Sequence, residues 1–137
     1  MSNVNYTIEW MDRVGATIHK MLPEGVTVTD KAARDAVYKA FPGYLLFCFC
    51  EKYRQQYATH WQAFEGFIPA QLYLIEKHHW LPERALALKE DELLLLLHRE
   101  LLDLRLPPRA HQKLQHNFEY LRIQDLHLNP AADNWPA

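Results

Sequence analysis

Leucines are concentrated in residues 88–106, where five occur in succession from Leu93 to Leu97. Helical periodicity of about 100° per residue divides these leucines between two sides of a helix. One apolar sector contains Leu93, Leu97, Leu101 and Leu104, and a nearly opposite sector contains Leu95, Leu102 and Leu106. Because each apolar sector needs a packing neighbour, we predict a helix at about 90–105 that is sandwiched between other helices.

A narrow polar strip separates the two leucine sectors and contains Asp91, His98 and Arg105. Both sectors are expected to be covered, so His98 is predicted to be at least partly buried. The three polar side chains would also be the first group to inspect for a catalytic site. A polar seam whose hydrogen bonds are satisfied is the stronger interpretation.

Apolar positions at helical spacing predict four or five further helices. The first is capped by Thr7 and buries Met11, Val14, Ile18 and Met21 or Leu22; the others cover residues 30–41, 44–65, 69–80 and 108–122. Phe41-Pro42-Gly43 should separate two of them, because proline and glycine disfavour a helix interior. Residues 26–29 are predicted to be a loop.

These elements predict an all-α fold of five or six helices packed as a compact bundle around the leucine-rich helix at 90–105. A chain of 137 residues is the size of one domain, and 49% of its residues are hydrophobic. We therefore expect a single helical domain at 1–130 and a C-terminal tail at 131–137. Trp135 is the one residue expected to anchor this tail.

The charge pattern does not indicate any class of partner. Positive and negative residues are well mixed, the formal net charge is −2, and no segment is long and apolar enough to cross a membrane. The first residues lack the basic and apolar regions of a secretory signal. Cys48 and Cys50 lie only two positions apart, which suits a reducing compartment, so we expect a cytoplasmic protein.

No motif predicts a catalytic residue, a cofactor site or a metal site. The eight histidines do not repeat at ligand spacing, and Ser2 is the only serine. The four glycines are isolated from one another, which excludes a glycine-rich phosphate loop. An enzyme would need a site that assembles only in three dimensions.

An aromatic stripe is predicted along the helix at 44–65. It contains Phe49, Tyr53, Tyr57, Trp61 and Phe64. Core packing is the default interpretation, yet Tyr and Trp are also enriched at the centres of protein interfaces. Tyr53, Tyr57, Trp61 and Phe64 are accordingly the candidates for a protein interface.

Basic side chains on two helices offer an alternative, a nucleic-acid-binding regulator. The candidates are Lys31, Arg34 and Lys39 near 30–41, and Arg109, Lys113 and His116 near 108–122. Residues 30–65 loosely suggest a helix-turn-helix, but apolar and aromatic residues occupy the start of the helix that would read the bases.

The function we expect is that of a small soluble, non-enzymatic interaction protein, an adaptor or regulator that acts through helical contacts. Its partner would be another protein or a second copy of itself, with nucleic acid as the alternative and no membrane. This expectation rests partly on elimination, because the sequence contains no motif typical of a catalytic, metal-binding or nucleotide-binding site. Several amphipathic helices also carry Tyr and Trp.

Overall fold

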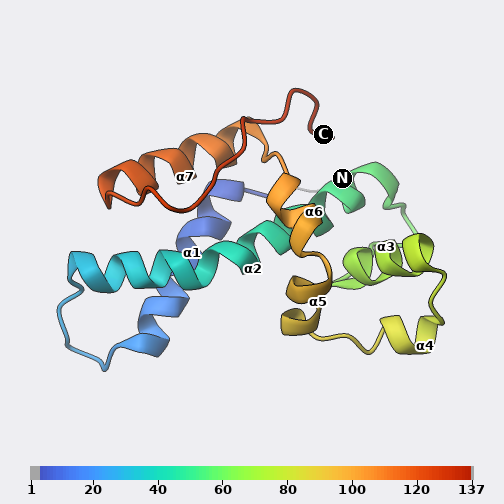
Figure 1. The fold of residues 1–137 in the computed structure, drawn as a ribbon, viewed down its shortest axis with the longest axis horizontal. Helices are drawn as coiled ribbons and strands as arrows, with labels where there is room; N and C mark the ends of the chain where they lie inside the picture. The colour runs from blue at the N-terminus through green and yellow to red at the C-terminus, as the bar shows by residue number, and fades with distance from the viewer. Residues whose placement is uncertain (1–3, 137) are drawn as a thin grey trace. The chain divides into compact units, whose positions relative to one another are not determined.

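The computed structural model describes residues 4–136, and helices account for 64% of them. Seven helices are present in this part of the chain and no strand, so the predicted all-α class is confirmed (Figure 1). The helices are α1 (Tyr6–Met21), α2 (Asp30–Tyr57), α3 (Ile68–His78), α4 (Pro82–Ala85), α5 (Glu90–Leu96), α6 (His98–Asp103) and α7 (Pro108–Tyr120).

The contacts within the chain define two compact units. The leucine unit is residues 45–104, and the terminal unit combines residues 4–44 with residues 105–135. Helix α2 contributes its first part to the terminal unit and its second part to the leucine unit. The expectation of one domain at 1–130 followed by a tail at 131–137 stays a prediction.

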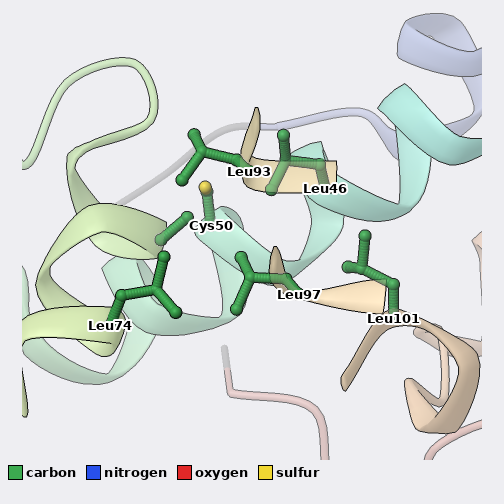
Figure 2. Close-up of a cluster of buried hydrophobic side chains, with 7 residues drawn as sticks. Leu46, Cys50, Leu74, Leu93, Leu97 and Leu101 are labelled. Atoms are coloured by element: carbon green, nitrogen blue, oxygen red, sulfur yellow. The ribbon is translucent and has the colours of Figure 1, made fainter. Parts of the chain in front are cut away.

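The core of the leucine unit gathers side chains from α2, α3, α5 and α6 (Figure 2). Its buried members are Leu46, Cys50, Ala70, Leu74, Leu93, Leu97 and Leu101. Cys50 packs there as a small apolar group, which is the usual role of a buried thiol. The first leucine sector is therefore buried as predicted, and Leu104 is also only 9% exposed.

The second leucine sector differs from the prediction. Leu95 is 78% exposed and Leu102 is 50% exposed, and only Leu106 of that sector is buried. Because this side is largely uncovered, His98 is exposed, and its predicted burial is wrong.

The leucine segment is also not one helix, since it divides at Leu97 into α5 and α6. Leu97 has φ −100° and ψ 12°, and its side chain is fully buried. Residues 90–103 contain no proline or glycine, so no local signal encodes the break. Leu93, Leu97 and Leu101 lie in one core on either side of the break, so it does not divide the buried face.

Helix α2 runs through Pro42, which contradicts the predicted helix end at Phe41-Pro42-Gly43. Proline inside a helix loses one backbone hydrogen bond and costs about 3 kcal/mol. Buried aromatic contacts oppose this cost on both sides of the proline. Phe41 packs edge-on against Phe118 at 5.4 Å between ring centroids, and Tyr44 packs against Trp10 at 5.1 Å.

The terminal unit centres on Trp10, which is 1% exposed and donates from Nε1 to Asn117 Oδ1 at 3.2 Å. The predicted apolar side of α1 omitted Trp10 and included Met11, which is 54% exposed. Asn5, not Thr7, caps α1 by accepting from the Ile8 N–H at 3.0 Å.

Other expectations for the terminal unit hold. Ala110, Leu114 and Phe118 are buried on α7 at the predicted spacing, and residues 26–29 form a loop. Trp135 does anchor its segment, because its Nε1 donates to Tyr6 Oη at 2.9 Å. Arg105 also holds that segment by donating to the carbonyls of Pro130 and Ala131.

Candidate functional site

The aromatic candidates lie at the end of α2 and in the loop that follows it. The helix ends at Tyr57 instead of continuing to residue 65, so Trp61 and Phe64 are loop residues, which corrects the predicted helical stripe. Tyr53 contacts the Tyr57 ring at 4.8 Å and the Phe64 ring at 5.3 Å between centroids. We call Tyr53, Tyr57, Trp61 and Phe64 the aromatic surface.

Exposure differs sharply within the aromatic surface. Trp61 is 83% exposed and Tyr57 is 58% exposed, whereas Tyr53 and Phe64 are half-buried; Tyr53 joins Tyr57 and Phe64 by ring contacts, and Trp61 stands apart from these contacts. Burial raises the pKa of the Tyr53 hydroxyl, and the Glu76 carboxylate adds to the effect. The Tyr53 hydroxyl therefore keeps its proton across the neutral range.

Arg54 fixes the loop that carries Trp61. Its Nη1 donates to the carbonyl oxygens of Phe64 at 2.7 Å and Gly66 at 2.9 Å, and its Nε pairs with Glu51 Oε1 at 2.6 Å. Phe64 and Gly66 both have positive φ, 54° and 60°, a conformation that costs energy at Phe64 in particular. The Arg54 hydrogen bonds stabilise this turn.

A backbone contact inside the loop restricts it further. Thr59 and Gln62 exchange backbone hydrogen bonds at 2.9 and 3.2 Å, and Thr59 Oγ1 accepts from the Gln62 N–H. Trp61 therefore stands at the tip of a short, hydrogen-bonded turn. Such a turn restricts the backbone that carries the indole, which reduces the backbone entropy lost when a partner covers it.

A second polar group of the leucine unit connects α3 to α6. Glu100 Oε2 accepts hydrogen bonds from Tyr73 Oη at 3.0 Å and from Lys77 Nζ. Burial opposes ionisation of Glu100, but the hydrogen bonds from Lys77 and Tyr73 outweigh it and hold its pKa below the ordinary value. The group is a structural tie between helices, since all three side chains already satisfy one another.

The basic candidates all lie in the terminal unit. Lys31 and Lys39 are exposed on α2, Arg34 is half-buried, and Lys31 Nζ lies 3.8 Å from Asp35 Oδ2. On α7, Arg109 and His116 are exposed and Lys113 is half-buried. Within residues 4–136, no ion pair neutralises Arg109 or Lys113.

The helix-turn-helix suggestion is wrong, because α2 crosses residues 42–43 without a turn. Any phosphate contact would therefore come from a helix face, not from a recognition helix that follows a turn. Arg109, Lys113 and His116 do share one face of α7, at i, i+4 and i+7.

The polar strip proposed for catalysis is divided in the structure. Asp91 lies in α5 and His98 begins α6, and both are exposed. Arg105 follows α6 and is engaged by two backbone carbonyls and by Asp133 Oδ2 at 3.7 Å. The helix break at Leu97 therefore removes the single helical strip on which the catalytic hypothesis rested.

The part of the chain that the structure describes contains no group of three or more His, Cys, Asp or Glu side chains placed to hold a metal ion. Among the helices of residues 4–136, none combines the length and the apolar character that crossing a membrane requires. Comparison of the chain with protein-family models, with curated proteins and with solved structures finds no match in any of the three.

Proposed function

We propose that this chain is a non-enzymatic interaction protein of the cytoplasm that binds another protein through the aromatic surface. The observation that carries the proposal is the 83% exposure of Trp61 on a turn closed by Thr59 and Gln62, in a loop whose later residues Phe64 and Gly66 are held by Arg54. A partner that covers an exposed indole removes a large apolar surface from water, which favours binding. Cys48 and Cys50 are buried thiols, which supports the cytoplasmic location.

The division of the aromatic surface into exposed and half-buried rings matches what an interface centre needs. Tyr53 and Phe64 support the surface from below, while Tyr57 and Trp61 offer rings that a partner can cover. Interface residues of this kind often contribute 2 kcal/mol or more when they are truncated, on the order of a thirtyfold loss of affinity.

The test compares partner capture by the wild-type chain with capture by Trp61→Ala and Tyr57→Ala. Tyr120→Ala is the matched control, because Tyr120 is 80% exposed but lies on α7, away from the aromatic surface in sequence and in unit. We expect a protein that wild type and Tyr120→Ala retrieve in equal amount and that both aromatic-surface variants lose. A partner retained by Trp61→Ala would contradict the proposal.

A second candidate function, nucleic-acid binding, is favoured by the unneutralised Arg109 and Lys113 on one face of α7. If both contact phosphates, the logarithm of affinity should fall with the logarithm of salt concentration with a slope of about −1.8. Titration of a fluorescent duplex at several salt concentrations measures this slope. Arg109→Gln with Lys113→Gln should abolish the binding, and a wild-type chain that shows none at low salt removes this candidate.

A further inference from the structure

Helix α1 carries a second apolar face on the side opposite Trp10. Its members are Ile8, Met11, Gly15 and Ile18 of the helix, together with Leu22, the extended residue that directly follows it; they follow one another at alternating steps of three and four residues. This spacing is the heptad pattern of two helices that pack along a shared seam. Ile8 is 53% exposed and Met11 is 54% exposed, so one end of the seam is open to solvent.

The two ends of this face have complementary shapes. Ile8 and Met11 project as exposed apolar side chains near the start of α1. Near its end, Ile18 and Leu22 line an open hollow of about 370 Å³ together with Val26 and Val28 of the following loop. Val26 is 50% exposed and Val28 is 47% exposed, so the hollow offers apolar side chains to a partner beside the polar side chains of His19 and Glu24, which also line it.

Gly15 lies at the middle of the seam. A Cβ atom built on Gly15 would meet nothing within 4 Å, so no side chain or loop among residues 4–136 covers this position. Glycine lets another backbone approach closely, because it has no side chain to hold the two apart. The centre of the face is therefore the natural crossing point for a second helix.

The polar residues beside the seam indicate which helix packs there and in which direction it runs. Asp12 and His19 are exposed on the same flank of α1, seven residues apart, on either side of Gly15 and Ala16. A two-fold axis midway between Gly15 and Ala16 exchanges positions 12 and 19. In an antiparallel pair of identical helices, each Asp12 carboxylate thus lies beside an imidazole that can donate to it, whereas in a parallel pair these flanks lie on opposite sides of the seam and Asp12 has no such neighbour.

We infer that α1 pairs with α1 of a second copy of this chain, in antiparallel orientation, along the face formed by Ile8, Met11, Gly15, Ile18 and Leu22. The same two-fold axis brings Ile8 and Met11 of each copy to the hollow of the other. Every contact is therefore made twice, as in an isologous dimer interface. The seam lies in the terminal unit and shares no residue with the aromatic surface, so the inference does not depend on the proposed function.

Sedimentation velocity of the full chain, between about 1 µM and about 1 mM, tests the pairing. We expect a monomer–dimer equilibrium whose dissociation constant rises about tenfold or more in Met11→Glu. Lys20→Glu is the matched control, because Lys20 is exposed on α1 outside the seam, and it should associate as wild type does. Circular dichroism of each variant checks that α1 is still folded.

Exchange of charges tests the direction. Asp12→Lys and His19→Glu should each weaken the dimer, and the double variant should recover it, because lysine of one copy then lies beside glutamate of the other. A chain that is monomeric throughout, or a dimer that Met11→Glu leaves unchanged, overturns the inference. Failure of the double variant to recover overturns the antiparallel pairing, and a dimer lost only in Trp61→Ala assigns association to the aromatic surface instead.

Discussion

Replacement of Arg54 by alanine should destabilise the leucine unit by about 3–5 kcal/mol, the cost typical of removing one partner from a buried ion pair. Glu51 is buried and Arg54 half-buried, since their side chains are 6% and 17% exposed. Arg54 also donates to the carbonyls of Phe64 and Gly66. The hydrogen bond to Gly66 contributes less to the cost, because Gly66 is exposed and water can replace the guanidinium there.

Urea denaturation followed by circular dichroism measures the loss, with Arg13→Ala as the matched control. Arg13 also pairs with a glutamate on its own helix, Glu9 at 3.2 Å, but those side chains are 30% and 33% exposed. A more exposed pair of this kind contributes about 0.2–1 kcal/mol. Adding Glu51→Gln to Arg54→Ala should recover part of the stability, because the buried carboxylate charge is then absent.

If Arg54→Ala lowered the free energy of unfolding no more than Arg13→Ala does, the Arg54–Glu51 pair would not stabilise the leucine unit as expected. The substitution also bears on function. With the carbonyls of residues 64 and 66 released, the turn that presents Trp61 should become mobile. Partner capture should therefore weaken under conditions in which the variant is still folded, although every ring of the aromatic surface is unchanged.

Three further predictions concern other parts of the chain. Because the pKa of Glu100 is lowered in the folded state, its contribution to stability is present above the unfolded value of about 4.3 and is lost as pH falls through the folded pKa. Glu100→Gln should therefore lower the melting temperature at pH 7 more than at pH 3, and equal losses would contradict the tie between α3 and α6. Gly15→Ala should stabilise α1 by about 1 kcal/mol, since alanine favours a helix and the added Cβ meets nothing within 4 Å. Urea denaturation at low protein concentration measures this, and destabilisation would show that the position is covered. Leu97→Ala should cost about 2–5 kcal/mol and the more exposed Leu95→Ala less than about 0.5 kcal/mol, so similar losses in denaturant unfolding would show that both leucine sectors are buried.

The sequence predicted those features that depend on local periodicity. Apolar residues three and four positions apart correctly placed the first leucine sector in the core, because spacing alone places them on one helical face. The loop at 26–29 was likewise predicted, because so short an extended segment has no strand to pair with. Residue type alone identified Tyr57 and Trp61 as interface candidates. It did not predict how exposed they are, or that Trp61 lies in a loop.

Tertiary contacts decided what periodicity leaves open, namely which apolar faces are covered and where a helix stops. Pro42 lies inside α2 because Phe41 and Tyr44 pack against residues far away in the sequence, and this packing outweighs the local cost of proline. Leu95 is the same residue type as its buried neighbours Leu93 and Leu97, yet among the described residues no element covers it. The hydrogen bonds that Arg54 makes across the turn at 58–67 carry no sequence signal at all. Periodicity shows that a face can be buried, whereas burial itself depends on contacts between residues that the chain brings together only when it folds.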